Sequence, residues 1–472
     1  MSDSGQPTLT DRQALGGIIA LDGFDYQTWD GLIRLPGWLI NPTFEQLMFE
    51  GFDDVEARFF APYAPRGTLL DRYQAKSADL EPSAVKTVFE TFQDFERAHP
   101  KSVRAFTLVT PRLPSSLRWV VREGARLRNA RPFYAPFPDV MAASDAKFFE
   151  RCVDEWGEDL GAFVASRVEA FERAAGGRDQ ALHGFCLEFG RAFPGLDVPS
   201  RQLERAFVSL CERAAQARGT GIQRAELLDI VETAVDRAVV DRAKTAVHVR
   251  SDRNGADETA LEIDASAFSG GSTPFPEVET WSKDLMRPLV STASWFAARG
   301  ISRISLRGSY RLSTGLALGW ALRSGVGFEL EIATREGAWA TDDRPRADED
   351  YPAWTVTEAE ELDGDRLVVS VGVMRYPVDT LVSHGQDRHR VLDGSIAVPI
   401  TSARAAQHLV GSLKQAITAN ASRLGARAID LYYAGPAAFA VAIGHRWNAM
   451  LPTQLFEFLP ANQLYVATAR LE

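Results

Sequence analysis

The stretch RYQAK at residues 72–76 decides the fold of the N-terminal part, together with EGFDDV at residues 50–55. Side chains on a strand alternate between its two faces, so Gln74 and Lys76 lie on the same face. Asp54 can meet them from a neighbouring strand. A carboxylate and a neighbouring oxygen can hold a hard cation such as Mg²⁺, and the lysine can stabilise charge on a phosphate or orient an attacking water. The pattern therefore indicates a metal-dependent hydrolytic site.

The residues around this motif predict a helix, a strand pair, a second helix and a further strand. Proline is favoured in the first turn of a helix, and the apolar residues that follow Pro82 recur with helical period. The expected elements are a helix over 20–35, an extended stretch over 46–61, a strand over 69–76, a helix opened by Pro82 and a buried strand over 102–110.

Size and composition predict a soluble, globular chain of two or three domains, with 472 residues and 45% hydrophobic content. No run approaches the roughly 18 apolar residues of a membrane span, and the N-terminus lacks the features of a secretory signal. The three cysteines are widely spaced, which argues against a disulfide framework or a zinc site and favours the cytoplasm. The net charge of −11 argues against indiscriminate nucleic-acid binding, so any DNA contact needs a local basic patch.

One basic patch lies between Arg112 and Arg131, where six arginines accompany a single acid. Arg118, Arg122 and Arg126 are spaced by four residues, so on a helix they form one stripe that can follow a phosphate backbone. A solvated helix face would show the same pattern.

The C-terminal third contains an internal repeat. Residues 304–332 and 429–458 each predict a strand, a helix and a strand. Five positions match at a constant offset: Leu306, Leu316, Leu318, Gly319 and Leu330 correspond to Leu431, Val441, Ile443, Gly444 and Leu455. Two such units predict Rossmann-like halves that share one pocket at the carboxyl ends of their strands, where helix N-termini favour phosphates. Two βαβ segments of an ordinary α/β domain would also look alike.

These features resemble two known families. From about Lys244 to Glu472 the chain resembles the SAVED domain, a fusion of two CARF-like halves that senses cyclic oligonucleotides in bacterial anti-phage signalling (CBASS). The match is carried by residues 432–446 and 454–458, with residues 364–385 fitting its middle. The N-terminal part resembles the restriction-endonuclease-like, PD-(D/E)xK domain of one class of SAVED effectors. The expected α/β architecture is a nuclease core over 1–145, a helical extension or connector over 146–243 and a SAVED domain over 244–472.

The nuclease resemblance implies that Asp54 and Gln74 are metal-site residues for Mg²⁺, with Mn²⁺ as an alternative, and that Lys76 is the catalytic lysine. Gln27 sits where related nucleases carry an auxiliary Glu or Gln, although a partly exposed helical residue fits equally. Because a one-residue slip in strand register would exchange the adjacent aspartates, Asp53 remains an alternative to Asp54. The family's usual acid before the lysine is glutamine here, which leaves less negative charge for a metal.

For the sensor, the residues that follow the two repeat strands are the predicted ligand contacts. Arg307 can pair with phosphate, Gly435 allows close backbone approach, and Trp339, expected in a loop, can stack on a base or fill a core. The complete set is Arg307, Ser309, Tyr310, Trp339, Tyr432, Gly435 and Pro436.

The resemblance implies a cytoplasmic endonuclease that cuts double-stranded DNA when a cyclic oligonucleotide, most consistently a cyclic trinucleotide, drives its homo-oligomerisation. The alternative is a non-enzymatic nucleotide-sensing regulator whose N-terminal domain only binds DNA or a partner. Convergence of Asp54, Gln74 and Lys76 in space would favour the enzyme. A dinucleotide-dependent enzyme is disfavoured, because Gly325-Val326-Gly327 lacks the third glycine of the fingerprint and precedes a strand.

Overall fold

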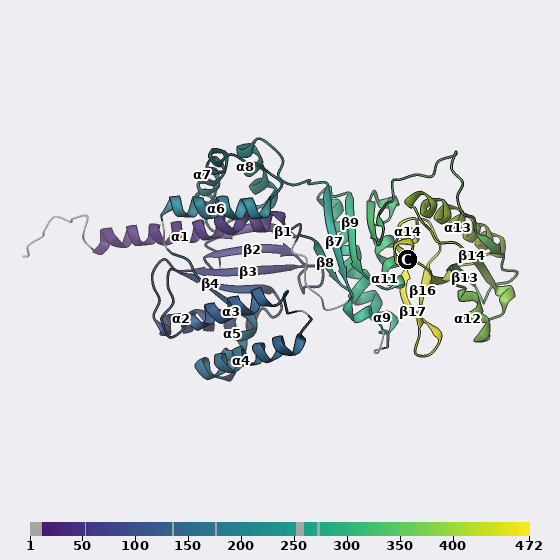
Figure 1. Cartoon of the computed structure of the whole chain (residues 1–472), viewed down its shortest axis with the longest axis horizontal. Helices are drawn as coiled ribbons and strands as arrows, with labels where there is room; N and C mark the ends of the chain where they lie inside the picture. The colour runs from purple at the N-terminus through teal and green to yellow at the C-terminus, as the bar shows by residue number, and fades with distance from the viewer. Residues whose placement is uncertain (1–11, 52, 135, 175–176, 252–258, 271–273) are drawn as a thin grey trace, which may run out of the picture. The chain divides into compact units, whose positions relative to one another are not determined.

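The computed structural model divides the chain into two compact units, Met1–Val240 and Asp241–Glu472 (Figure 1). The described residues are 12–51, 53–134, 136–174, 177–251, 259–270 and 274–472, with the backbone alone described for 12–22. None of the helices in these ranges combines the length and apolar character needed to cross a membrane.

The first unit is built on a six-stranded mixed sheet with the order β5-β4-β3-β2-β1-β6. Its neighbours are antiparallel from β6 through β1 and β2 to β3, and parallel from β3 through β4 to β5. The strands are β1 (Phe44–Phe49), β2 (Val55–Phe60), β3 (Thr68–Ala75), β4 (Val103–Thr110), β5 (Val168–Glu172) and β6 (Gly221–Gln223).

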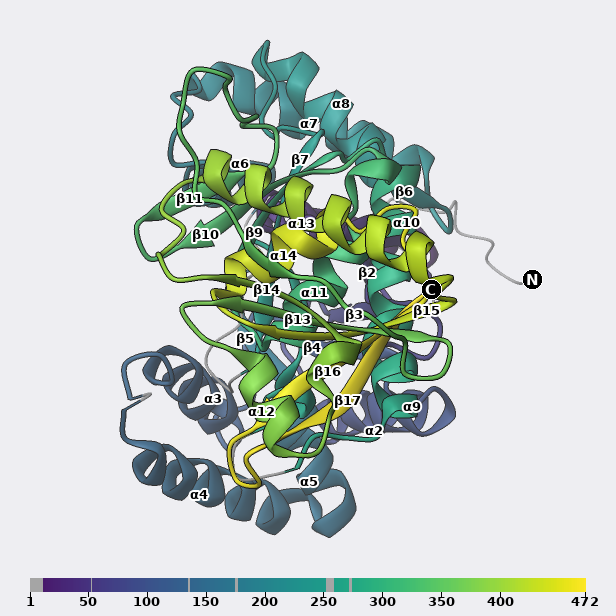
Figure 2. The same cartoon turned by 90° about the vertical axis from the view of Figure 1, so that its right-hand side faces the viewer.

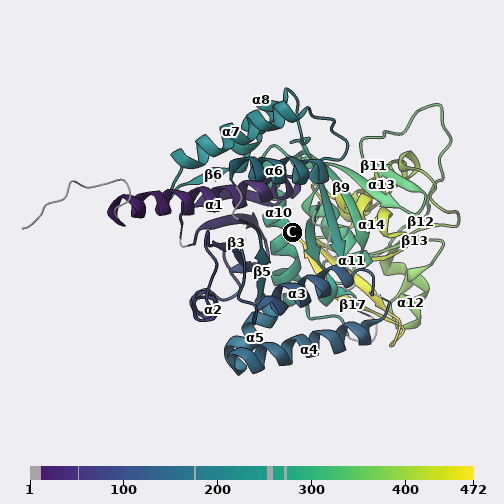
Figure 3. The ribbon, with the colours of Figure 1, turned by 60° about the vertical axis from the view of Figure 1, so that its left-hand side comes forward.

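Helices cover both faces of this sheet (Figures 1 and 3). One face carries α1 (Arg12–Ile40), α6 (Arg178–Ala192), α7 (Ser200–Gln216) and α8 (Arg224–Val235). The other carries α2 (Pro82–Ala98), α3 (Arg118–Ala130), α4 (Pro138–Trp156) and α5 (Glu158–Arg167). Each face has its own core, with Phe49, Phe185 and Phe207 in the first and Phe89 and Phe106 in the second. Full burial of one such side chain contributes about 2–3 kcal/mol.

The elements expected near the motif are confirmed, with one refinement and one difference. The extended stretch over 46–61 is a hairpin of β1 and β2. The segment 146–243 contains the expected helices, and its residues up to Val240 belong to the first compact unit, so this part extends that unit and is not a separate connector. Its strands β5 and β6 extend the sheet at both edges. They are only five and three residues long, so their pairing depends on tertiary contacts more than on a local pattern.

The second unit contains two sheets with matching strand orders. The first sheet is β11-β10-β9-β7-β8, and the second is β17-β16-β15-β13-β14, extended by β12. The first set is β7 (Lys244–Arg250), β8 (Leu261–Asp264), β9 (Arg303–Ser309), β10 (Glu329–Thr334) and β11 (Gly337–Ala340). The second is β12 (Thr355–Thr357), β13 (Arg366–Val373), β14 (Val391–Ile396), β15 (Ala428–Ala434), β16 (Thr453–Leu459) and β17 (Leu464–Leu471). The predicted internal repeat is therefore confirmed.

The two halves meet through α11 (Leu312–Ala321) and α14 (Ala437–His445), the equivalent helices of the repeat (Figure 2). Gly319 and Gly444 lie at this contact and let the two backbones approach closely. The other α-helices of this unit are α9 (Val278–Trp281), α10 (Arg287–Ala298), α12 (Pro377–Ser383) and α13 (Ala403–Leu424). A π-helical turn (Ser282–Met286) and short 3-10 helices (Ser266–Phe268, Ser324–Val326 and Arg388–Arg390) complete the helical segments described.

Candidate functional site

Asp54, Gln74 and Lys76 converge at one end of the β2–β3 pair. The register places Val55 opposite Tyr73, so Asp54 stands opposite Gln74. Gln74 Nε2 donates a hydrogen bond of 2.8 Å to Asp54 Oδ2, and the backbone N–H of Ala75 donates one of 2.7 Å to the same oxygen. Lys76 Nζ lies 3.8 Å from that oxygen. The arrangement places a carboxylate, an amide and an ammonium group around one point.

Burial and the neighbouring positive charge shift the pKa of the Asp54 carboxyl group in opposite directions. Burial raises the pKa of its carboxyl group, whereas the Lys76 ammonium and the hydrogen bonds from Ala75 and Gln74 lower it. The Asp54 side chain is 16% exposed and that of Lys76 is 37% exposed. The Asp54 carboxylate is therefore largely shielded from solvent, with Gln74 and Ala75 as its hydrogen-bond donors. The Lys76 ammonium remains accessible to a charged substrate.

Asp53 points into a buried cluster instead. Its Oδ2 forms an ion pair of 2.5 Å with Arg72 Nε, and Glu56 lies 3.8 Å from the same nitrogen. The Arg72 guanidinium also stacks on the ring of Phe95 at 3.4 Å. Burial, opposed by Arg72, raises the pKa of Asp53 to about 6. Of the two adjacent aspartates, Asp54 is thus the one that meets Gln74 and Lys76.

Gln27 lies on α1, on the face that covers this end of the sheet. A Cβ atom on Gly23 would lie 3.9 Å from Ser77 Oγ, and one on Gly31 would lie 3.2 Å from Val55 Cγ1. Helix positions four residues apart share a face, so Gln27 lies between these two contacts. Its role as an auxiliary site residue stays a prediction.

The oxygen atoms at this point fit a hard cation that keeps most of its waters. Asp54 Oδ1 and Gln74 Oε1 are oxygen donors of the kind that Mg²⁺ binds, and Mg²⁺ commonly takes only one or two carboxylates from a protein. Within the described ranges, no group of three His, Cys, Asp or Glu side chains could hold a metal. Asp54 and Gln74 would therefore hold the ion weakly until a substrate phosphate joined them.

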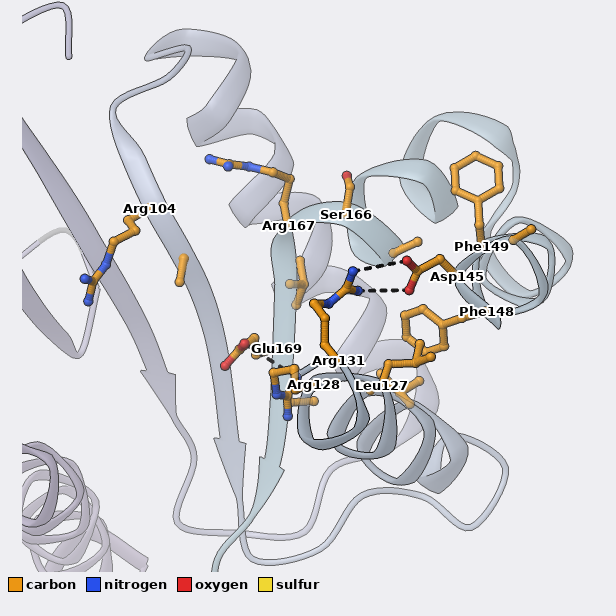
Figure 4. Close-up of a pocket in the computed structure, with 17 residues that line it drawn as sticks. Arg104, Leu127, Arg128, Arg131, Asp145, Phe148, Phe149, Ser166, Arg167 and Glu169 are labelled. Carbon is orange, nitrogen blue, oxygen red and sulfur yellow. Dashed lines mark hydrogen bonds and ion pairs between the residues drawn. The ribbon is translucent and has the colours of Figure 1, made fainter. Parts of the chain in front are cut away.

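Arg118, Arg122 and Arg126 lie on α3 (Arg118–Ala130), where their spacing by four residues places them in one stripe. Arg118 Nε pairs with Glu172 Oε1 at 3.0 Å, while Arg122 and Arg126 are exposed and form no ion pair with any residue that the structure describes. A different face of α3 borders a cavity of about 570 Å³. There Arg131 binds Asp145 through two nitrogens and Arg128 pairs with Glu169, so much of the positive charge is compensated (Figure 4).

In the second unit, the first group of predicted ligand residues lies at the carboxyl end of β9. Arg307 and Ser309 are exposed, and Ser309 Oγ lies 3.2 Å from Ser251 Oγ. Tyr310 is half-buried, and a Cβ on Gly315 of α11 would touch its ring. Burial raises the pKa of Tyr310. These three residues thus lie next to the N-terminal end of α11.

The second group divides between the strand end and the strand interior. Gly435 and Pro436 lie between β15 and α14, where the Tyr433 hydroxyl donates to Pro436 O at 2.9 Å. Tyr432, by contrast, is inside β15, where its ring stacks on Phe456 with centroids 4.2 Å apart. It packs with the small hydrophobic cluster next to α12.

Trp339 differs from its expected setting in a loop. It lies in β11 and pairs with Ile332 of β10. Gly337 makes this possible, because its φ of 140° allows the chain to reverse directly after β10. The side chain is half-buried.

Sequence reasoning missed a buried acid at the start of α11. Glu457 Oε2, from β16, accepts a hydrogen bond of 2.7 Å from the backbone N–H of Ser313. Burial raises the pKa of Glu457 despite this bond. In the described part of the chain, the hydrogen bonds from the first turn of α14 go to a backbone acceptor, Pro436 O, which accepts from the N–H groups of Phe439 and Ala440. The only available signal was one acid in a strand whose other residues are uncharged.

Residues 292–471 match the family model of the SMODS-associated and fused to various effectors sensor domain, SAVED. The chain contains a SAVED domain. Its matched residues include both β9 and β15 with their following helices, so the symmetric pair of strand ends belongs to the SAVED domain.

Two known proteins resemble the chain along nearly its whole length. The CD-NTase-associated protein 4 of Acinetobacter sp. is 23% identical over 478 residues, which cover 98% of this chain and 99% of that protein. The protein of the same name from Moraxella osloensis is 23% identical over 473 residues, with the same coverage. The resemblance to SAVED-domain effectors of CBASS is thereby confirmed.

Solved structures confirm the α/β fold. The Acinetobacter baumannii Cap4 SAVED/CARF-domain containing receptor, in complex with the cyclic trinucleotide 2′3′3′-cAAA, superposes with a TM-score of 0.78 at 20% identity, covering 95% of this chain and 98% of that one. The Moraxella osloensis Cap4 receptor gives 0.74 at 20% identity, covering 96% and 100%. The SAVED domain and the N-terminal unit therefore both have counterparts in these receptors.

Proposed function

We propose that this chain is a cyclic-oligonucleotide-activated, metal-dependent endonuclease that cuts double-stranded DNA in bacterial anti-phage defence. The observation that carries the proposal is the convergence of Asp54, Gln74 and Lys76 on one end of a mixed sheet. This site belongs to the same chain as a SAVED domain, which is a sensor. A sensor joined to a hydrolytic site is the organisation that ligand-gated cleavage requires.

The residues divide the chemistry among them. Asp54 and Gln74 would hold Mg²⁺ or Mn²⁺, which supplies Lewis-acid activation of water and of the scissile phosphate when bound. The two donors on Asp54 Oδ2 keep the other carboxylate oxygen in a fixed orientation. Lys76 places a positive charge where the phosphate gains negative charge in the transition state. Arg122 and Arg126 contribute exposed charge for the DNA backbone.

The ligand of the SAVED domain is proposed to be a cyclic trinucleotide. Support comes from the ends of β9 and β15, where Arg307, Ser309, Tyr310, Gly435 and Pro436 adjoin the starts of α11 and α14. Phosphates are favoured at such helix starts. The Cap4 receptor of A. baumannii holds cyclic trinucleotides in its solved structures. Ligand binding would activate cleavage by favouring a homo-oligomer over the free chain.

A non-enzymatic regulator is the second candidate. It is favoured by the small number of carboxylates at the site, because the described residues offer no cluster of three metal-binding side chains there. In that case, the N-terminal unit would bind DNA or a partner without cutting.

Plasmid degradation with Mg²⁺ tests the proposal against this alternative. Purified protein is incubated with supercoiled plasmid and a panel of cyclic di-, tri- and tetranucleotides, with ligand binding and oligomeric state measured in parallel. Cleavage that depends on a cyclic trinucleotide is the expected result. Binding of a panel member without cleavage, in Mg²⁺ and in Mn²⁺, would establish the regulator instead.

A further inference from the structure

A second, positively charged cavity lies in the C-terminal unit, away from the strand ends described above. It measures about 520 Å³ and is bordered by α13, by the residues after α14 and by the loop after β11. Figure 2 shows α13 beside α14. Because Arg446 directly follows the last residue of α14, this cavity lies at the opposite end of α14 from Pro436. It is therefore separate from the proposed nucleotide pocket.

Three cations line this cavity: Arg344, Lys414 and Arg446. None of the cavity's lining residues is acidic. Lys414 Nζ donates to the backbone oxygens of Arg446 and Asn448, at 3.1 and 2.5 Å. Arg446 donates to Gln407 Oε1 at 3.0 Å and to Thr341 O at 3.3 Å. All of these acceptors are neutral, so the hydrogen bonds fix Lys414 and Arg446 in place without cancelling their charge.

A neighbouring arginine on the same helix, by contrast, has its charge neutralised by carboxylates. Arg404 of α13 binds Asp343 and Glu349, each at 2.8 Å. Asp343 and Glu349 thus neutralise Arg404. Among the residues that the structure describes, the three cavity cations have no carboxylate partner. Burial, together with the charge of Arg446, lowers the pKa of Lys414. The Arg446 guanidinium is in turn repelled by Arg344.

We propose that this cavity binds a phosphate group of a small molecule. Three convergent cations match the charge of a phosphate, and charge-assisted hydrogen bonds to its oxygens are among the stronger ones in proteins. The Lys414 ammonium has three hydrogens and two acceptors here, so it can donate to such a ligand. A long nucleic acid is disfavoured, because Arg344 belongs to a segment, from Asp342 to Asp365, that carries ten acidic residues.

Isothermal titration of the full chain with inorganic pyrophosphate and, separately, with adenosine monophosphate tests the proposal and distinguishes a free phosphate from a nucleotide. Chloride is used to match ionic strength. Saturable binding of at least one probe is expected, weakened about tenfold or more by Arg344→Gln and by Lys414→Gln. Arg427→Gln removes one exposed positive charge from the same unit, outside the cavity, and should bind as the wild type does.

Two results would contradict the proposal that this cavity binds a phosphate group. One is the absence of saturable binding of either probe to the wild-type protein. The other is equal affinity in the wild type and in folded Arg344→Gln. Arg344 is exposed and makes no hydrogen bond or ion pair with the described residues, so its replacement should leave the fold intact even if Lys414→Gln unfolds. Neither result depends on DNA cleavage or on binding at the β9 and β15 ends.

Discussion

Gly319 and Gly444 each face the backbone of the other's helix. A Cβ atom on Gly319 would lie 2.1 Å from Val441 O, and one on Gly444 would lie 2.1 Å from Leu316 O. The two glycines occupy the same position of the internal repeat, so the contact is reciprocal. Gly315 and Ala440, four residues earlier in each helix, also adjoin, with 3.3 Å between a Cβ on Gly315 and that of Ala440. The helices therefore run side by side in the same direction, with both N-termini at one end.

Replacement of Gly319 by alanine should loosen this contact. The added methyl group would meet a backbone oxygen, which cannot move aside as a flexible side chain can. We expect Gly319→Ala to lower the free energy of unfolding by about 2–3 kcal/mol, measured by urea denaturation. Gly411→Ala in α13 is the matched control, since nothing lies within 4 Å of its Cβ, and it should be neutral or stabilising. Equal effects of the two changes would refute the close-contact explanation.

Lys76→Met should abolish ligand-dependent plasmid cleavage and leave ligand affinity unchanged. The expected loss is about 100-fold or more, because a charge placed at the reacting phosphate is removed while the sensor lies in a different unit. Lys86→Ala, which removes an exposed lysine paired with Glu90 on α2, should cut as the wild type does. Undiminished cleavage by folded Lys76→Met would show that the lysine is not catalytic.

Arg307→Ala should weaken binding of the cyclic trinucleotide about tenfold, through loss of one charge-assisted hydrogen bond. Arg303→Ala serves as the control on the same strand, since it lies at the opposite end of β9 and pairs with Asp241. Titration calorimetry measures both. If Arg303→Ala weakened binding as much as Arg307→Ala, the effect would belong to the net charge of the unit and not to the strand end.

His445 should make stability depend on pH. Its Nδ1 lies 2.7 Å from Leu322 O, and burial lowers its pKa to about 4. An unfolded histidine titrates near 6.5, so between pH 6.5 and 4 protons bind the unfolded chain first. The contribution of neutral His445 to the free energy of unfolding is thus complete above pH 6.5. It is lost as pH falls towards 4, by up to about 3 kcal/mol.

His445→Asn can keep the bond to Leu322 O, and its unfolding free energy should vary less over this range. Measurement of urea unfolding at several pH values checks this. Identical pH profiles for the two proteins would contradict the assignment.

Arg72→Met should destabilise the first unit by about 3–5 kcal/mol at pH 8, because Asp53 and Glu56 would remain buried without a cation. The pKa of Asp53 is already raised to about 6. Removal of Arg72 raises it further, so the folded variant holds a proton that the unfolded chain releases. Stability of the variant should therefore fall as pH rises from 5 to 8, relative to the wild type. Thermal unfolding at both pH values measures the difference, and a loss independent of pH would argue against buried charge as the cause.

Local sequence rules predicted the part of the site that depends on strand periodicity. Gln74 and Lys76 share a face because their spacing is two, and Asp54 meets them because β2 and β3 are adjacent. The pairing of Asp53 with Arg72 could not be predicted, since it depends on how the chain bends before β2. Glu457 reaches Ser313 from 144 residues away along the chain, a contact that only the docking of the two halves creates. The short strands β5 and β6 likewise form because they pair with the edge strands β4 and β1.

The carboxylate of Glu457 bears on how a ring-shaped ligand would be oriented in the SAVED domain. This carboxylate accepts a hydrogen bond from the first turn of α11, whereas the hydrogen bonds that the described residues form in the first turn of α14 go to a backbone oxygen, that of Pro436. Two halves with one backbone plan therefore have chemically unlike helix starts. A ring-shaped ligand bound there would have one preferred rotation, and its corners could be told apart even when they carry the same base.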